Sequence, residues 1–597
     1  MNRPQIRASQ LVTTFGPGAM VDLPEGSIIV GGLDHWHYEA GRFFAIDEPR
    51  LLAKLRHILD KPTLTLRAPP PANENPQEFH PDVTGWTFPE WFIVQNTVTT
   101  GRGFRRRRLV QLVALEGKRY QDVDKKKHPV VPVRFVRACK RGHVGDIDWQ
   151  AFVHGAGDPC PRDLWIEERG TSGDLDEVWI VCDCGKDRAM SQAARLELKA
   201  LGHCNGSRPW LGAGTRESCG ELNRLLIRSA SNAYFPQLMS VISIPDPKTP
   251  VDDVVRAAWE AGLSIVDSPE KLVLVRQIPA VAVRIQGLDD DVLMASIERV
   301  RSGSGFLDKP VKEAEFEALS DAKEELGSDV PEGAFFARTL PQEKWQAAWM
   351  ANVGRVVLVH RLREVVAQLG FTRFEAIGPD IQGELELDVQ PAALATDATW
   401  LPAVENRGEG VFLKFRTDAI RAWLKRPEVI ARGKTLLGGF ERWKAEHEDS
   451  RREFPGLPYY MLHSFSHLLL TAMALECGYP ASSLRERVYA AEGTYGILIY
   501  TGSSDAEGTL GGLIQATRDI RRHVRRALEM GLLCSNDPVC AHHAPAKHDH
   551  QQLLGSACHG CLLVSETSCE QRNEFLDRAL VVPTVEALGA GFFDAVS

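Results

Sequence analysis

The alternation of apolar and polar positions predicts strands in the first third of the chain and helices further on. Short runs rich in β-branched residues, bounded by glycine or proline, are typical of strands. Longer segments that repeat apolar residues every three or four positions are typical of helices. Strands are expected in GSIIVGG, RRLVQLVAL and HPVVPVRFV, and helices in VDDVVRAAWEAG, EAEFEALSDAKEELG and YYMLHSFSHLLLTAMALECGY.

The same pattern divides the 597 residues into four segments, because a chain of this length exceeds one hydrophobic core. Residues 1–135 mix strands with a proline-rich loop, and residues 136–245 are rich in cysteine. Residues 246–345 are acidic and mainly helical, and residues 346–597 alternate helices and strands up to a second cysteine cluster. We predict an α+β or mixed α/β multidomain protein with embedded zinc-ribbon-like modules.

Composition places the chain among globular proteins, at 44% hydrophobic and 25% charged residues. The start, MNRPQIRASQ, has no following apolar segment of the kind that secretion requires. The longest apolar run, near residues 467–477, is shorter than the roughly 18 residues of a membrane span. We therefore expect a cytoplasmic protein with no membrane partner, in which the 12 cysteines favour metal binding over disulfides.

Six of these cysteines lie between Cys139 and Cys219. With two nearby histidines they supply eight donors, enough for two closed zinc sites of four ligands each. An interleaved division is the alternative, as is His203 in place of a named ligand. Chain order favours one site of Cys139, His143, His154 and Cys160, and another of Cys182, Cys184, Cys204 and Cys219.

Five more cysteines lie near the end of the chain. Cys558 and Cys561 have the spacing of a zinc knuckle, Cys534 and Cys540 complete a tetrahedron, and Cys569 is a spare or a substitute. Four thiolates leave no position for water, so this zinc is expected to be structural, one of two to three such ions. The alternative is a site with fewer thiolates, completed by a histidine among His542, His543, His548 and His550.

Charge is distributed unevenly. The whole chain carries −9, yet residues 101–150 hold fourteen Lys and Arg against five Asp and Glu. Such a stripe is a candidate surface for phosphate, although a solvated loop would look the same. A second basic surface is predicted on the helix TRDIRRHVRRALEMG, for phosphate or for an acidic partner. The candidate contacts are Arg102, Arg105, Arg106, Arg107, Arg108, Lys125, Lys126 and Lys127, and on the helix Arg518, Arg522 and Arg525.

The last segment contains a candidate pocket. His463 and His467 lie at i and i+4 on one helix face, and the strand YGILIYTG leads into a polar loop with Asp505 and Glu507. Loops between a strand and a helix N-terminus are where α/β proteins bind polar ligands. The four residues could form the site of a metal-dependent nucleic-acid-processing enzyme, or pack as ordinary core and turn. The chain lacks a P-loop and the hydrolase motif G-x-S-x-G, which favours a protein without catalysis.

Several long motifs together resemble one known family. They are RASQLVTTFGPGAMVDLP, CKRGHVGDIDW, SNAYFPQLMSVISIP, HRLREVVAQLGFTRFEA, VENRGEGVFLKF, LHSFSHLLLTAMALECGY, GTLGGL and the final cysteine cluster. They resemble DrmB, a core component of bacterial DISARM anti-phage systems, and the C-terminal part resembles a domain appended to DNA helicases of the Mrf type. The resemblance implies a non-motor subunit that joins a DrmA-like helicase, and other DISARM components, to recognise and bind invading DNA.

Overall fold

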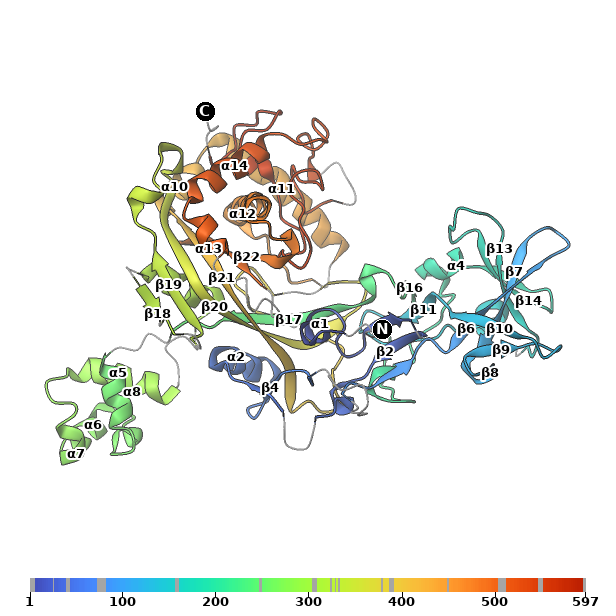
Figure 1. The fold of residues 1–597 in the computed structure, drawn as a ribbon, viewed down its shortest axis with the longest axis horizontal. Coiled ribbons are helices and arrows are strands. Elements are labelled where there is room, and N and C mark those ends of the chain that lie inside the picture. Colours follow the sequence, from blue (N-terminus) through green and yellow to red (C-terminus); the bar gives the residue numbers. More distant parts are fainter. Residues whose placement is uncertain are drawn as a thin grey trace.

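The computed structural model describes residues 6–593, apart from residues 25, 39–42, 72–81, 156–159, 246–249, 303–308, 323–324, 328, 331–332, 377–378, 386–390, 448–449, 503–511 and 546–550. Within the described residues the protein has a mixed α+β fold with zinc-ribbon-like modules, as the sequence predicts. Figure 1 shows three parts: a sheet at the right, a larger body with the C-terminal helices, and a small helical unit at the lower left.

The sheet at the right is antiparallel, and its eight strands follow the order β15-β14-β13-β7-β6-β10-β9-β8 (Figure 1). Alternate residues of its central strands, among them Ile93, Ile166 and Ile180, are buried on one face. That face packs on helix α3, through Trp149 and Phe152. The strands are β6 (Trp91–Thr99), β7 (Arg105–Gln111), β8 (Leu115–Glu116), β9 (Arg119–Gln121), β10 (Lys127–Pro132), β13 (Leu164–Glu168), β14 (Val178–Cys182) and β15 (Asp187–Ala189), and α3 is Trp149–His154.

The larger body is built on two long antiparallel strands, β20 (Val353–Thr372) and β21 (Trp400–Phe415). Seven further strands join them in the sheet that the described residues form. These strands come from all four predicted segments, so one sheet crosses the predicted boundaries at residues 135, 245 and 345. The division of the chain into four segments stays a prediction. The added strands are β3 (Ala45–Ile46), β4 (Thr65–Arg67), β17 (Phe235–Ile242), β18 (Glu325–Gly327), β19 (Phe335–Thr339), β22 (Leu484–Ala491) and β23 (Thr494–Thr501).

Two small sheets lie between these larger ones. One joins β1 (Met20–Leu23), β2 (Gly26–Val30) and β5 (Gly85–Thr87), and the other joins β11 (Phe135–Ala138), β12 (Val144–Gly145) and β16 (Arg224–Ile227). The second matters for function, because residues that follow β11 and precede β12 carry predicted zinc ligands.

Helix α12 (Gly456–Cys477) is the centre of the C-terminal core (Figure 1). Its residues from Tyr459 to Leu470 are buried all round, which explains why its apolar positions show no single stripe. By contrast, α14 (Ile520–Leu532) buries Ile520, Val524 and Leu528 and turns its arginines outward. The neighbouring helices are α10 (Thr417–Trp423), α11 (Pro427–Glu446) and α13 (Gly512–Thr517). Among the described helices, none combines the length and apolarity that crossing a membrane requires.

The remaining α-helices of the described residues all precede residue 322. Helices α5 to α8 pack around their own apolar cluster, which includes Val255, Leu272 and Ile297. The helix predicted over EAEFEALSDAKEELG ends at Asp321, because Glu325–Gly327 pairs with β19 as a strand. The helices are α1 (Ala8–Thr13), α2 (Pro49–Leu59), α4 (Ser191–Ala194), α5 (Pro250–Ala257), α6 (Pro269–Val275), α7 (Pro279–Ala282), α8 (Asp290–Ser302) and α9 (Val311–Asp321).

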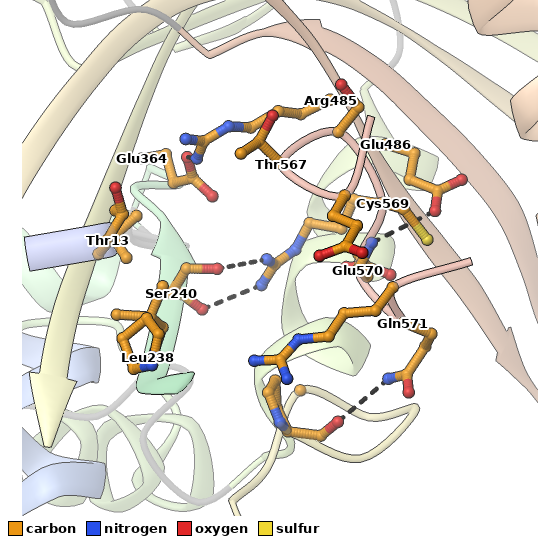
Figure 2. Close-up of a pocket in the computed structure, with 18 of the residues that line it drawn as sticks. Thr13, Leu238, Ser240, Glu364, Arg485, Glu486, Thr567, Cys569, Glu570 and Gln571 are labelled. Atoms are coloured by element: carbon orange, nitrogen blue, oxygen red, sulfur yellow. Dashed lines mark hydrogen bonds and ion pairs between the residues drawn. The ribbon is translucent and has the colours of Figure 1, made fainter. Parts of the chain in front are cut away.

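A cavity of about 360 Å³ lies between β17, β22 and the loop of residues 566–572. Figure 2 shows Glu486 and Cys569 on one wall, and Leu238 and Ser240 on the wall opposite. Two arginines of β22 line it, and both are already paired. The Arg485 guanidinium lies 2.9 Å from the Glu364 carboxylate, and the Arg487 guanidinium lies 2.6 Å from Glu315.

Arg373, directly after β20, ties three remote segments together. Its fully buried guanidinium donates to the carbonyl oxygens of Gly142 at 2.9 Å, Ala233 at 2.5 Å and Gly18 at 2.7 Å. Burial lowers the pKa of Arg373 to about 10, so the side chain is still charged at neutral pH. Gly142 lies between two predicted zinc ligands, so this arginine fixes the position of that turn.

We expect Arg373→Met to destabilise the protein strongly, because it removes the hydrogen-bond donors of three buried carbonyl groups. Each buried carbonyl group left without a donor lowers the free energy of unfolding by about 1–3 kcal/mol. The midpoint of urea unfolding measures the loss. Arg421→Met is the matched control, since Arg421 is 60% exposed in its pair with Glu492 and should leave the midpoint nearly unchanged. Equal midpoints for both variants would contradict the role given to Arg373.

Candidate metal centres

The structure brings the twelve predicted zinc ligands together in three groups of four. In each group the donor atoms all lie within 4.8 Å of one another. The sequential division favoured by chain order is wrong, and the interleaved alternative describes the first two groups. They are Cys139, His143, Cys204 and Cys219; His154, Cys160, Cys182 and Cys184; and Cys534, Cys540, Cys558 and Cys561.

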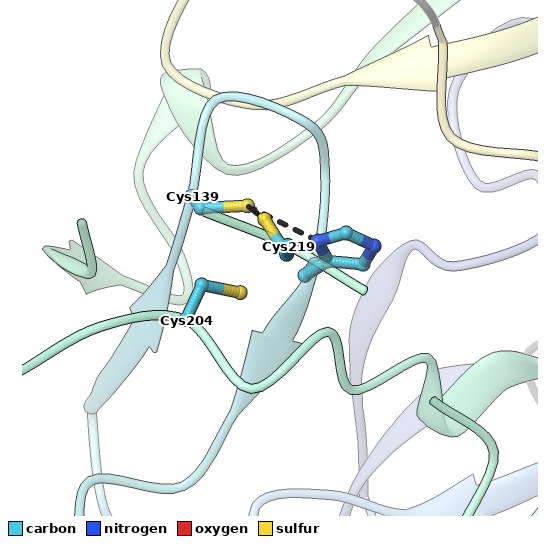
Figure 3. A group of neighbouring side chains, drawn as sticks. Cys139, Cys204 and Cys219 are labelled. Carbon is cyan, nitrogen blue, oxygen red and sulfur yellow. Dashed lines mark hydrogen bonds between the residues drawn. The ribbon is translucent and has the colours of Figure 1, made fainter. Parts of the chain in front are cut away.

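The first group joins the turn between β11 and β12 to the loop that precedes β16. The Sγ atom of Cys139 lies 3.3 Å from Nδ1 of His143 and 4.0 Å from Sγ of Cys219. Figure 3 shows the Cys139 and Cys219 side chains directed toward each other, with Cys204 beside them. Gly142 has φ +83°, a left-handed conformation that glycine adopts without strain and that tightens the turn.

The second group lies at the edge of the eight-stranded sheet. Cys182 ends β14, and the packing of α3 against that strand brings His154, the last residue of the helix, beside it. The Nε2 atom of His154 lies 3.2 Å from Sγ of Cys184, and the Cys160 and Cys182 sulfurs are 3.6 Å apart. Strand pairing, rather than chain order, therefore places Cys182 and Cys204 in different groups.

The third group follows α14. The Cys534 and Cys558 sulfurs are 3.3 Å apart, and those of Cys540 and Cys561 are 3.7 Å apart. The predicted histidine alternative finds no support in the described residues: His542 pairs with Glu586, and His543 contacts the carbonyl of Gln551. His548 and His550 lie outside the described residues.

These distances fit zinc and exclude disulfides. Bonded sulfurs are about 2.05 Å apart, whereas the edges of a tetrahedron around zinc with 2.3 Å bonds to sulfur are about 3.8 Å. The histidines also carry the outer contacts typical of zinc ligands, which orient the ring through its second nitrogen. His143 Nε2 lies 2.7 Å from Glu217 Oε1, and His154 Nδ1 lies 3.0 Å from the carbonyl of Gln150.

Local hydrogen bonds lower the pKa of one thiol in each group. The Cys139 thiol donates to Cys204 and lowers the pKa of Cys204 to about 4. A backbone N–H lowers the pKa of Cys184 to about 6, and the thiol of Cys561 lowers the pKa of Cys540 to about 6. Each group thus contains a thiolate at neutral pH, which is the form that binds zinc.

The basic residues predicted to contact nucleic acid fall into two sets. Three arginines of β7 are paired with acidic residues of the neighbouring segments, so their charge is neutralised within the sheet. These pairs are Arg106–Asp183, Arg107–Glu168 and Arg108–Asp163. Lys127 lies 3.6 Å from Glu116, and the remaining four side chains are exposed without an ion-pair partner among the described residues: Arg102, Arg105, Lys125 and Lys126.

On α14 the arginines form one exposed face, as predicted. Arg522 lies 3.2 Å from Glu476, and Arg525 lies 3.1 Å from Glu529 in the same helix. Within the part of the chain that the structure describes, Arg518 and Arg521 have no ion-pair partner. This face, with Arg518 just before the helix, is called the α14 arginine face below.

Of the four predicted pocket residues, the structure describes two. His463 and His467 are fully buried, and they converge on Glu486 and Cys569. Asp505 and Glu507 lie outside the described residues. Sequence reasoning missed Glu486, which lies in a strand 19 residues after His467. The spare Cys569 was the sequence feature that indicated a further ligand near these histidines.

A chain with several cysteine and histidine clusters on a mixed fold belongs to the class of zinc-stabilised multidomain proteins. Residues 465–562 match the MrfA Zn-binding domain, and residues 7–235 match a domain of unknown function, DUF8724. The DISARM protein DrmB of Bacillus paralicheniformis is 30% identical over 539 residues, which cover 87% of this chain and 92% of that protein. The chain therefore belongs to the DrmB family of DISARM antiviral defence proteins, and it carries structural zinc at several sites.

The grouping predicts how zinc is lost from double variants. In Cys139→Ser/Cys160→Ser the two cysteines belong to different groups, so the protein should lose two zinc ions per chain. In Cys139→Ser/Cys204→Ser they share a group, so it should lose one. Mass spectrometry of the metal content of purified full-length protein measures both. The reverse pattern would restore the sequential division.

Proposed function

We propose that this protein is the non-motor subunit of a cytoplasmic DISARM complex, in which it binds a DrmA-like helicase and helps to recognise and bind invading DNA. The three groups of four donors are its zinc ligands and hold the DNA-facing and partner-facing surfaces rigid. The chain has no P-loop, so it needs a partner to move along DNA. Membership of the DrmB family supports this role.

The observation that carries the proposal is a set of cations, without ion-pair partners among the described residues, at one end of the eight-stranded sheet. Thr97 pairs with Arg107 in the β6–β7 hairpin, and Val130 pairs with Val94, which brings Lys127 level with Thr97. The turn with Arg102 and the turn with Lys125 and Lys126 therefore lie at the same end of the sheet. Together with Arg105 these four side chains form the sheet-end patch.

A patch of this kind suits a phosphate backbone. The sheet-end patch sits on a chain of net charge −9, so long-range attraction of DNA depends on local cations and not on the whole surface. The paired arginines of β7 support the hairpin from within the sheet, and the four side chains of the patch contact phosphate. Such contacts position the protein on DNA without reading its sequence.

The α14 arginine face suits the helicase partner. It lies in the C-terminal part of the chain, within the match to the MrfA Zn-binding domain, and Arg518 and Arg521 point away from the core. The resemblance to a domain appended to Mrf-type helicases supports the same interpretation. Where that domain and a helicase motor share one chain, the chain itself holds them together. Here the subunit and the helicase are separate chains, so their association requires a charged docking surface.

Reversing the sheet-end patch, by Arg102→Glu, Arg105→Glu, Lys125→Glu and Lys126→Glu together, should weaken DNA binding about tenfold or more at physiological salt. The slope of log K against log salt should fall by about one for each phosphate that the variant no longer neutralises. Fluorescence anisotropy with duplex and single-stranded DNA over a range of salt concentrations measures both quantities.

The control for this variant is Lys434→Glu/Arg442→Glu, which reverses two exposed cations of α11 outside the patch. Its affinity and salt slope should stay close to those of the natural protein. An unchanged slope in the patch variant would show that DNA is bound elsewhere or not at all.

Reversing the α14 arginine face, by Arg518→Glu and Arg521→Glu, should abolish co-purification with a tagged DrmA-like helicase while DNA binding by the isolated subunit persists. The reason is that an acidic surface on the partner would meet like charge. Size-exclusion chromatography of the co-expressed pair measures complex formation, with the α11 variant again as control. If the natural pair itself does not form, the helicase-binding role is wrong.

A further inference from the structure

A fourth group of donors lies deep in the C-terminal core, apart from the three predicted zinc sites. Two come from successive turns of α12, one from β22 and one from the loop that lines the cavity. Their ligand atoms lie within 4.8 Å of one another, and the first three side chains are no more than 2% exposed. The members are His463, His467, Glu486 and Cys569, called the α12 group.

In each of the two histidines, one ring nitrogen faces the other donors of the group and the second contacts a backbone carbonyl outside it. Nδ1 of His463 lies 3.3 Å from the carbonyl oxygen of Phe575, and Nδ1 of His467 lies 2.8 Å from that of Leu562. A carbonyl oxygen only accepts, so each Nδ1 carries a proton and donates it. In a neutral ring the other nitrogen, Nε2, then presents a lone pair.

Both Nε2 atoms point at the same carboxylate oxygen, which also only accepts. Nε2 of His463 lies 2.8 Å from Oε1 of Glu486, and Nε2 of His467 lies 3.2 Å from it. Nε2 of His463 is also 3.2 Å from Sγ of Cys569. Lone pairs that converge in a buried space repel one another unless a proton or a metal ion lies between them, and a single proton serves only one such contact, whereas a metal ion contacts all four donors. Two adjacent buried imidazolium ions facing one carboxylate would be the costlier alternative.

The outer contacts of the α12 group repeat those of the three predicted sites. The backbone N–H of Asn573 donates to Sγ of Cys569 at 3.1 Å. In the first and third predicted sites, N–H groups of glycines donate to Cys204 and Cys558, each at 3.3 Å. The two imidazoles donate to carbonyl oxygens, as zinc-bound histidines do.

The backbone beside Cys569 is also held in an unusual conformation. Arg572 and Asn573 have φ +52° and +64°, a left-handed conformation that asparagine adopts readily but that costs arginine free energy. This pair of residues turns the amide of Asn573 onto the sulfur of Cys569. Such strain persists where the surroundings over-determine it, and a metal bond to Cys569 would do so.

We propose that the α12 group binds a further zinc ion. Two imidazole nitrogens, a thiolate and a carboxylate oxygen are the donor types that zinc prefers, and a tetrahedron with bonds near 2.1 Å has edges of about 3.4 Å. The contacts of 2.8–3.2 Å approach those edges. Four protein ligands saturate the ion, so its role is to pin the cavity-lining loop to α12 and β22.

The test is the zinc content of the full-length protein, measured by mass spectrometry after purification without chelators. We expect four zinc ions per chain in the natural protein. Cys569→Ser should leave three, and Cys569→Ser/His463→Gln should also leave three because both residues belong to one site. Cys569→Ser/Cys540→Ser should leave two.

Matched controls come from the same helix. Cys477→Ser changes a half-buried cysteine outside all four groups, and Glu476→Gln is the counterpart of Glu486→Gln. Both controls should keep four ions, whereas Glu486→Gln should weaken retention of the fourth. A natural protein with three ions, or a Cys569→Ser variant with four, overturns the proposal.

A measurement on the unmodified protein covers the case in which the variants do not fold. Anomalous diffraction at the zinc absorption edge should show a peak between the two Nε2 atoms and Sγ of Cys569, equal in height to the peaks at the three cysteine-rich groups. No peak at that position, with peaks at the other three, overturns the proposal independently of any substitution.

Discussion

Repulsion between convergent electron-rich donors is the constraint on which this structure depends. In each cysteine-rich group four sulfur or nitrogen donors lie within 4.8 Å of one another, an arrangement that a shared zinc ion stabilises. Structural zinc supplies apparent binding energy of about 10–16 kcal/mol per site in small domains. That energy adds to the strand pairing and the buried core that already hold together the segments of Cys139 and Cys219, which are 80 residues apart.

The sequence predicts which residues bind zinc better than how they are grouped. Ligand type and close spacing are local properties, so the turn with Cys139 and His143 and the knuckle with Cys558 and Cys561 are visible in the chain itself. Grouping depends on which strands pair. Cys182 stays with the eight-stranded sheet through β14, while Cys204 follows the loop that precedes β16, and no spacing rule encodes that separation.

The arginine run at residues 105–108 shows a second limit of sequence reasoning. Composition counts charges but not their partners. In β7 three of these arginines are paired with acidic residues, Arg106 with Asp183, Arg107 with Glu168 and Arg108 with Asp163, and Arg105 has no ion-pair partner among the described residues. Cross-strand pairs of opposite charge stabilise a sheet. The overall α+β class was predictable because hydrophobic periodicity is local, but the twenty-residue strand β20, which gathers partners from distant segments, was not.

The first zinc group is tied to the long strand pair of the larger body by Arg373. β20 and β21 pair from Val353 opposite Phe415 to Ala367 opposite Ala403, and Arg373 then fixes the β11–β12 turn of the first zinc group. A ribbon of paired strands resists bending far more than a single chain does. The first zinc group and the C-terminal helices are therefore carried on one frame, which holds their positions relative to each other.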